Sequence, residues 1–156
     1  MTNKELARRI FDEIYTRGNL ELVEDTHGEH CKLRDPTFEE ILEGPEAARG
    51  YVASLRKAFP DFRITIDRQV AENDLVVSQV VCEGTQKGEY LGMPASNRKG
   101  TVRATIVQRF RDDKVEEADV MWDVLGLLYQ LGLKPAEAIH DEVAAALRAQ
   151  PMKTQG

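Results

Sequence analysis

The sequence lacks long hydrophobic runs. Its longest apolar runs are only a few residues, whereas a membrane helix needs ~20, so we expect no association with a membrane. The chain opens on Met1 to Glu5, a polar segment typical of a helix start, and not on a basic segment followed by an apolar core. Because the features of a secretory signal are missing, we expect a cytoplasmic protein.

Basic surface patches, cysteine motifs and metal-ligand clusters are also scarce. The formal net charge is -6, and acidic and basic residues are interleaved along the chain, which argues against binding to nucleic acid. Cys31 and Cys82 do not form a CxxC-like motif, and we interpret both as free, buried thiols. His27 and His30 lack a convincing third ligand, so no metal site is predicted.

What is present predicts one compact domain that begins with a helix. A chain of 156 residues with 42% hydrophobic content is long enough to bury a core. We expect one domain over residues 1–150 and a disordered tail at 151–156. Thr2 and Glu5 have the spacing of a capping box, and an apolar stripe at helical spacing follows them: Leu6, Ala7, Ile10, Phe11 and Ile14.

Four further helices are predicted, and one of them, over Leu125 to Leu131, follows the last strand. Asn19 is expected to cap a short helix that runs to about Asp25, and an irregular polar segment is expected after it. Pro45 stands at the first turn of an amphipathic helix that stops at Pro60. Pro135 opens a last helix near the end of the chain.

Between these helices the hydrophobic period changes from that of a helix to that of a strand. Residues 62–67, 75–81, 101–110 and 115–122 alternate or are rich in β-branched residues, and tight turns are expected at 73–74 and 112–113. Helices first and antiparallel strands second predict an α+β fold. We expect a cone-shaped α+β barrel, in which a curved, mostly antiparallel sheet and the N-terminal helices enclose a pocket, with an extra helix at the C-terminus.

Four local strings carry a resemblance to a known family. They are Gly44-Pro45-Glu46, Leu55-Arg-Lys-Ala-Phe-Pro-Asp-Phe62, Gly84-Thr-Gln-Lys-Gly-Glu-Tyr-Leu-Gly-Met-Pro94 and Trp122-Asp-Val-Leu-Gly-Leu-Leu-Tyr-Gln-Leu-Gly132. In this order and at these intervals they resemble the SnoaL-like polyketide cyclases, or ester cyclases, of the nuclear transport factor 2-like superfamily. The resemblance covers about Leu6 to Gly132.

The resemblance implies an intramolecular aldol ring closure that needs neither a metal nor an organic cofactor. In such chemistry a carboxylate removes a proton beside a carbonyl group, and a histidine assists the developing enolate oxygen. Aligned without gaps, this sequence has Ile106 at the histidine position and Val120 at the aspartate position. Neither side chain can transfer a proton.

Other residues are therefore weighed as the acid or base. The candidates are Asp119, Tyr15, His27 and Asp35. Asp119 directly precedes Val120, so in a regular strand it points to the opposite face, and only a bulge or an alignment slip would turn it inward. Asp123 lies where the last strand meets a short helix and is interpreted as a helix cap.

Strand periodicity predicts the wall of an apolar pocket. The predicted pocket residues are Tyr15, Phe59, Val102, Ala104, Ile106, Gln108, Ala118, Val120 and Trp122. Gln108 and the Trp122 indole N–H are the polar groups expected on this wall. A filled core without a cavity is the alternative. The reverse face of the same strands is expected to pair two copies of the chain as a homodimer.

Three functions stay open on the sequence alone. The first is a cyclase or isomerase whose acid or base has moved. The second is a non-catalytic protein that binds a small apolar molecule. The third is an interaction module, which would need no cavity.

Overall fold

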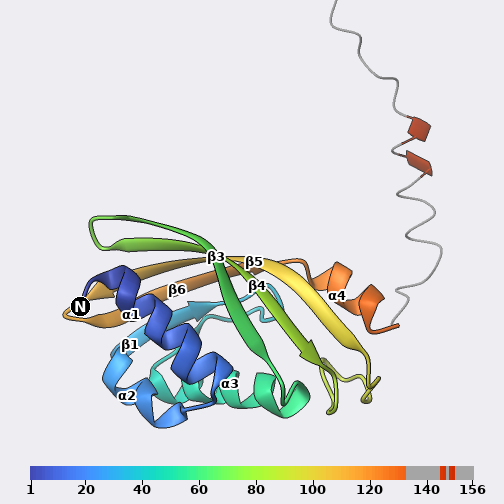
Figure 1. Ribbon diagram of the computed structural model, residues 1–156, viewed down its shortest axis with the longest axis horizontal. Helices are drawn as coiled ribbons and strands as arrows, with labels where there is room; N and C mark the ends of the chain where they lie inside the picture. The colour runs from blue at the N-terminus through green and yellow to red at the C-terminus, as the bar shows by residue number, and fades with distance from the viewer. Residues whose placement is uncertain (133–144, 147, 150–156) are drawn as a thin grey trace, which may run out of the picture.

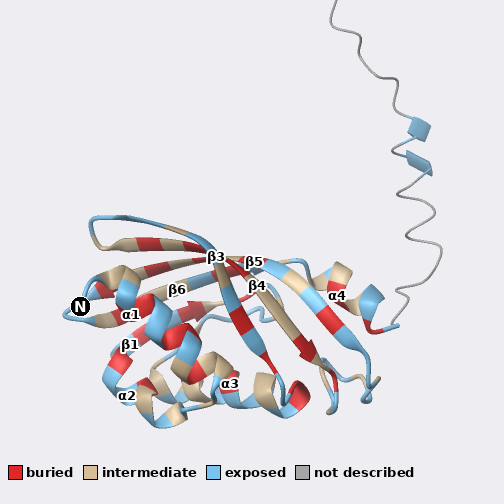
Figure 2. Cartoon of the chain, in the orientation of Figure 1, coloured by how far each residue is buried: buried red, intermediate tan, exposed pale blue. Residues whose placement is uncertain are grey.

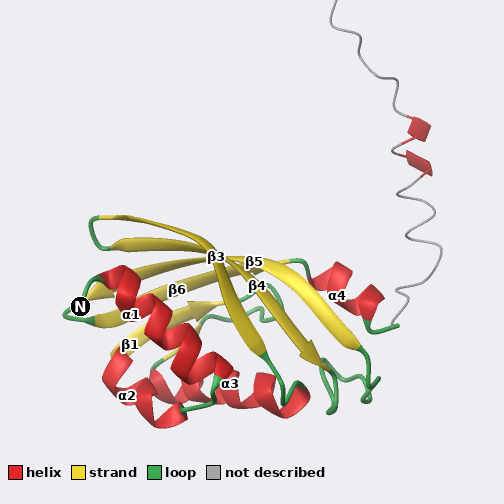
Figure 3. Ribbon diagram, in the orientation of Figure 1, coloured by secondary structure: helices red, strands yellow, loops and turns green. Residues whose placement is uncertain are grey.

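A single curved sheet carries most of the fold, with helices packed against one of its faces. The computed structural model describes residues 1–132, 145, 146, 148 and 149. The sheet has six strands in the order β2-β1-β6-β5-β4-β3, and it is not closed into a full barrel. Figures 1 and 3 show α1, α2 and α3 on one side of the sheet, and α4 beyond the end of β6. The predicted α+β class is confirmed.

The N-terminal helix begins as the sequence predicts. Helix α1 (Asn3–Arg9) is capped by Thr2, with both hydrogen bonds of the capping box to Glu5. It continues into a π-helical segment, η1 (Ile10–Thr16). All residues of the predicted apolar stripe are buried: Leu6, Ala7, Ile10, Phe11 and Ile14. The wider π turn also places Tyr15 beside Phe11, with ring centroids 6.2 Å apart.

The second predicted helix is present but begins differently. A 3-10 turn, η2 (Leu20–Leu22), leads into α2 (Val23–Thr26), and the Asn19 side chain makes no capping hydrogen bond. Val23 is fully buried, which fixes this short helix against the core.

The prediction of an irregular polar segment after residue 25 is wrong, because two strands lie there. Strand β1 (His27–Arg34) runs parallel to β6, and β2 (Leu42–Glu43) pairs with β1 in the antiparallel sense. The register of β1 shifts between His27 and Lys32. This irregularity breaks the period-two pattern, so the strand cannot be recognised from the alternation of apolar residues.

The remaining elements follow the sequence patterns. Helix α3 (Pro45–Ala58) has proline in its first turn, and it is followed in the chain by the strands β3 (Arg63–Glu72), β4 (Leu75–Thr85), β5 (Lys99–Arg111) and β6 (Lys114–Trp122). The turns at 73–74 and 112–113 contain residues with positive φ, as tight hairpins require.

The last described helix confirms that Asp123 is a helix cap. Helix α4 (Val124–Gln130) is capped by Asp123, whose carboxylate accepts a hydrogen bond of 2.8 Å from the Gly126 N–H. The predicted helix from Pro135 falls largely, and the tail at 151–156 wholly, outside the described residues. Among the described helices, none has the length and hydrophobicity needed to cross a membrane.

The two central strands pair so that the residues predicted for one wall lie side by side. Ile106 of β5 lies opposite Val120 of β6, with Ala104 opposite Trp122 and Gln108 opposite Ala118. The pairing shifts between Arg109 and Phe110, so β6 does contain an irregularity. It precedes Ala118 and leaves the alternation from Ala118 to Trp122 regular.

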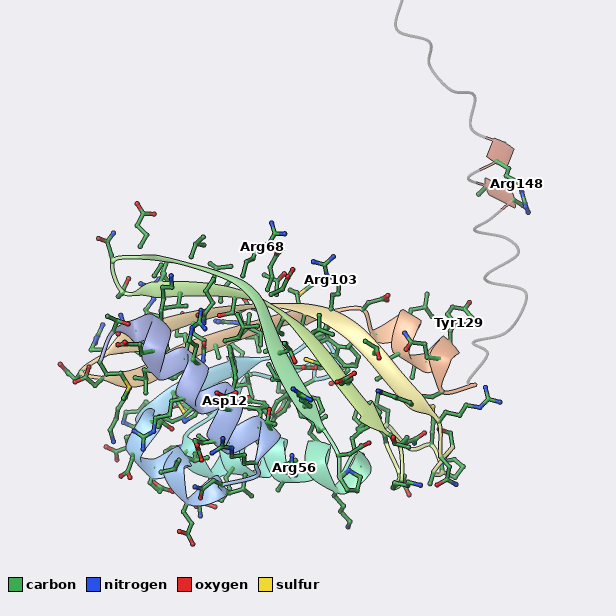
Figure 4. The ribbon with its side chains drawn as sticks, in the orientation of Figure 1. Asp12, Arg56, Arg68, Arg103, Tyr129 and Arg148 are labelled. Carbon is green, nitrogen blue, oxygen red and sulfur yellow. The ribbon has the colours of Figure 1, made fainter. Side chains whose placement is uncertain are left out.

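The two faces of the sheet differ in how far their residues are buried. Buried residues alternate with less buried ones along much of β4 and β5, and Figure 2 shows this alternation as bands of colour. In Figure 4, Arg68 and Arg103 point away from the helices on the outer face, where Arg103 forms an ion pair of 3.1 Å with Asp67. Pairing of two copies through this outer face stays a prediction.

Candidate functional site

A cavity lies between the inner face of the sheet and the helices. Its volume is about 90 Å³, counted as the space that the centre of a water molecule can reach. All the residues predicted for the pocket line it: Tyr15, Phe59, Val102, Ala104, Ile106, Gln108, Ala118, Val120 and Trp122. The structure therefore has an interior space, and not the filled core that was the alternative prediction from the sequence.

The middle of the cavity wall is apolar. Ile106 and Val120 are cross-strand partners there, and both are buried. Ile10 and Phe11 of η1 and Leu55 of α3 are apolar lining residues from the helical side. Neither Ile106 nor Val120 can donate or accept a proton.

Asp119 does not reach the cavity. It is exposed on the outer face of β6, where it lies opposite Val107 of β5 and beside Arg34 of β1. The irregularity in β6 does not turn it inward. Of the four acid or base candidates, only the other three lie near the cavity.

Asp35 lies at one end of the cavity, directly after β1. Its side chain is buried, and both carboxylate oxygens are fully engaged. Oδ1 accepts hydrogen bonds from the backbone N–H and the hydroxyl of Thr37, at 2.8 and 2.6 Å. Oδ2 accepts from the Tyr51 hydroxyl at 2.8 Å and from the Trp122 indole N–H at 3.0 Å. A carboxylate offers about four lone-pair sites, so this one has none left for a substrate proton.

This end of the cavity is its mouth. A second hollow adjoins it and shares Tyr51, Leu55 and Tyr90 with the cavity. Phe38 and Leu91, which also line that hollow, are 45% and 47% exposed.

Tyrosine hydroxyls ring the mouth. Burial, together with the nearby Asp35 carboxylate, raises the pKa of Tyr15 and of Tyr90 above the usual range, and burial is also the main cause that raises the pKa of Tyr51. The Tyr15 and Tyr51 rings meet edge to face at 6.4 Å. All three hydroxyls stay protonated at neutral pH, so they are hydrogen-bond donors and not bases.

Tyr90 lines the cavity but was not among the residues predicted for the pocket. It lies in a loop that Gln86 holds in place: the Gln86 amide donates to the carbonyls of Gly88 and Pro94, both at 3.2 Å, and accepts from the Ser96 N–H at 3.2 Å. Gln86 is fully buried. The signal available in the sequence was the string from Gly84 to Pro94, which contains both residues.

The opposite end, the floor of the cavity, contains His27. It is the first residue of β1 and pairs with Val115 of β6. Its Nδ1 lies 2.9 Å from the Thr26 hydroxyl oxygen, and that hydroxyl lies 2.7 Å from the Leu22 carbonyl. Because a carbonyl only accepts, the Thr26 proton must point to Leu22, and Thr26 must accept the Nδ1 proton of His27.

This tautomer leaves the lone pair of the His27 ring on Nε2. None of the described hydrogen bonds involves Nε2. Burial lowers the pKa of His27 to about 4, with a small contribution from Lys114, while the Val23 carbonyl acts in the opposite direction. At neutral pH the ring is therefore neutral, with a free lone pair. His30, by contrast, is a surface residue whose side chain is 81% exposed.

Gln108 is the second polar residue of the floor. It is 3% exposed and lines the cavity, and its Oε1 has no hydrogen-bond partner among the described residues. The sequence predicted two polar groups for this wall, Gln108 and the Trp122 N–H. In the structure these two groups differ in hydrogen bonding. The Trp122 N–H donates to Asp35, whereas the Gln108 Oε1 has no described partner.

The cysteines also lie on the cavity wall. Both are free thiols; Cys31 is buried and Cys82 is partly buried. Burial raises the pKa of Cys82 to about 12 and raises that of Cys31 less far. Neither is a thiolate at neutral pH, so neither is a nucleophile in this state.

Comparisons with known proteins agree with this architecture. The family model for SnoaL-like polyketide cyclases matches residues 5–131. A solved structure described as a putative SnoaL-like polyketide cyclase from Jannaschia sp. CCS1 is 26% identical, with a TM-score of 0.76 over 85% of this chain and 93% of that one. TsrD from Streptomyces laurentii is 25% identical, with a TM-score of 0.75 over 84% of this chain and 95% of its own.

A more distant structure supports the fold alone. A protein from Catenulispora acidiphila DSM 44928 with a ketosteroid isomerase-like fold, in complex with trimethylamine, is 18% identical. Its TM-score is 0.72, over 85% of this chain and 96% of that one. No curated protein matches the chain.

Proposed function

The chain belongs to the SnoaL-like polyketide cyclase family, and we propose that it performs acid/base chemistry, without an organic cofactor, on a small apolar carbonyl compound. The observation that carries this proposal is the His27 side chain. It lines the floor of the cavity, it is neutral at pH 7, and its Nε2 lone pair has no described partner. His27 thus supplies a base in a cavity where Ile106 and Val120 occupy the histidine and aspartate positions of the family.

The proposed step is proton removal from the carbon beside a carbonyl group. The C–H bond breaks, its electron pair forms the carbon–carbon double bond of an enolate, and the carbonyl π electrons move to oxygen. The proton goes to Nε2 of His27, which then returns it to the product, either to another carbon or to an oxygen formed by carbon–carbon bond closure. These outcomes are isomerisation and aldol-type cyclisation.

The other acid or base candidates support this assignment by their surroundings. Asp35 accepts four hydrogen bonds, Tyr15 keeps its proton, and Asp119 is exposed on the outer face. A pKa of about 4 makes His27 a weak base, comparable to an unperturbed aspartate. Its advantage is that nearly every molecule carries the unprotonated form at neutral pH.

A second candidate function is binding without chemistry. The specific observation in its favour is the apolar pair of Ile106 and Val120, which occupies the positions that the family uses for histidine and aspartate. A protein with this pair would hold the same apolar compound in the same cavity and release it unchanged.

Exchange of carbon-bound protons separates the two functions without knowledge of the natural substrate. The wild-type protein is incubated in D₂O with apolar bicyclic ketones, beginning with 1-tetralone, and loss of the α-proton signal is followed by NMR. Occupancy of the cavity is followed separately through the fluorescence of Trp122, which is the only tryptophan of the chain. We expect the protein to accelerate exchange.

The matched variants are His27→Asn and His30→Asn. In His27→Asn the amide N–H can replace the Nδ1 proton toward Thr26, whereas the equivalent of Nε2 is gone. We expect exchange to fall by roughly a hundredfold or more in His27→Asn and to stay unchanged in His30→Asn. Fluorescence quenching without exchange in the wild type would support binding alone, and equal exchange in both variants would contradict the role of His27.

A further inference from the structure

We infer that Gln108 orients the ligand by binding a hydroxyl group and a carbonyl group that stand next to each other, as in a hydroxyketone or an enolised β-dicarbonyl compound. This inference rests on the proposed function and narrows its class of ligand. It assigns a specificity-determining role to Gln108 that is separate from the role of His27.

The Gln108 amide is enclosed by the protein and has no described partner. Its side chain is 3% exposed, and Oε1 is buried without a hydrogen-bond partner among the described residues. A buried polar atom without a partner destabilises the folded protein, so such atoms are rare unless a function requires them. None of the described hydrogen bonds involves the Gln108 Nε2 group either.

Gln86 differs from Gln108, because it is also buried but its amide is satisfied on both sides. Gln86 donates to backbone carbonyls and accepts from the Ser96 N–H. Where a glutamine holds a loop in this protein, the fold supplies its partners. At Gln108 the fold supplies no such partners, although the side chain is almost equally buried.

The surroundings of Gln108 on the sheet provide no alternative partner. Its direct neighbours across the strands are Val76 of β4 and Ala118 of β6, which have no polar side-chain atoms. Ile10 and Phe11 line the cavity from the helical side. A molecule inside the cavity would supply the partner that these residues do not.

The chemistry of an amide then defines the group that it recognises. Gln108 offers an acceptor, Oε1, beside a donor, the Nε2 amine, whichever way the amide is turned. A simple ketone would satisfy only the donor. A ligand with a hydroxyl group next to its carbonyl satisfies both atoms, while the rest of it stays in contact with the apolar wall formed by Ile106 and Val120.

This orientation is compatible with His27 as the base. His27 pairs with Val115, and Val115 pairs with Phe110, which is two residues beyond Gln108 on β5. His27 and Gln108 therefore belong to the same end of the cavity. A ligand held by Gln108 through its oxygens would present the carbons beside its carbonyl to this end.

The test compares two probes that differ in one group, α-hydroxyacetophenone and propiophenone, in which a methyl group replaces the hydroxyl. Dissociation constants are measured through Trp122 fluorescence for the wild type, Gln108→Met and Gln79→Met. Gln79 is the control because it lies opposite Thr105, on β4, outside the cavity lining. We expect the wild type and the control to bind the hydroxyketone roughly three- to tenfold more tightly than propiophenone.

In Gln108→Met this preference should disappear or reverse, while propiophenone is still bound. Removal of the unpaired amide should also raise the thermal midpoint of the ligand-free protein by about 2–4 °C, which Gln79→Met should not do. Equal binding of the two probes by the wild type, or an unchanged preference in Gln108→Met, would overturn this inference and leave the proposed function standing. Failure of the wild type to bind either probe would contradict both.

Discussion

The two ends of the cavity differ in how their polar groups are used. At the mouth, the Asp35 carboxylate accepts four hydrogen bonds, including those from Tyr51 and Trp122. At the floor, the Gln108 Oε1 has no described partner, and His27 uses only its Nδ1. The mouth is complete without a ligand, whereas the floor is not.

Burial alone does not reveal this difference. Asp35 is 6% exposed and Gln108 is 3% exposed, so the two side chains are almost equally removed from solvent. What separates them is hydrogen bonding. The satisfied cluster at the mouth fixes the positions of Tyr51 and Trp122 and thereby the shape of the entrance, while the unsatisfied groups at the floor are free to meet a ligand.

The largest effect in this comparison is expected from Asp35→Asn. The amide would place N–H groups against existing donors, from Thr37 on one side or from Tyr51 and Trp122 on the other. We expect the free energy of unfolding, measured by urea denaturation, to fall by about 4 kcal/mol. The control, Asp119→Asn on the exposed face, should change it by less than about 0.5 kcal/mol. Similar values for the two variants would show that the mouth is not held by Asp35.

The next largest effect is the pH dependence that His27 gives to stability. Its pKa is about 4 in the folded protein, against about 6.5 in an unfolded chain, so the unfolded state binds the proton first as the pH falls. This residue should therefore destabilise the protein progressively from pH 6.5 to pH 4, by about 3 kcal/mol in total, and add no further change below pH 4.

Urea denaturation at a series of pH values checks this expectation. His27→Asn should remove this part of the acid destabilisation, because its side chain does not titrate, whereas His30→Asn should follow the wild type. A wild-type profile that is flat between pH 6.5 and pH 4 would mean that His27 is not enclosed as the structure places it.

The sequence predicted those features that depend on local patterns. The capping box at Thr2, the hairpin turns and the shared face of Ile106 and Val120 follow from helix caps, turn residues and a strict period of two. Both faces of β6 were assigned correctly for the same reason: the alternation from Ala118 to Trp122 is regular. These predictions needed no knowledge of distant contacts.

The parts that were missed depend on contacts between distant segments. Strand β1 escaped detection because its register shifts after His27 and because His27, a polar residue, occupies a buried position in it. The bond from Trp122 to Asp35 joins residues 87 positions apart. The sequence named Gln108 and the Trp122 N–H as equivalent polar groups, and no local pattern could show that only one of them would be occupied.

The most direct test of the account is a crystal structure of the protein with α-hydroxyacetophenone bound. We predict that the hydroxyl and carbonyl oxygens of the ligand lie within hydrogen-bond distance of the Gln108 amide at the floor, with Asp35 still bound to Tyr51 and Trp122. A ligand whose oxygens instead meet Tyr51 or Trp122 at the mouth, with Gln108 unpaired, would contradict it.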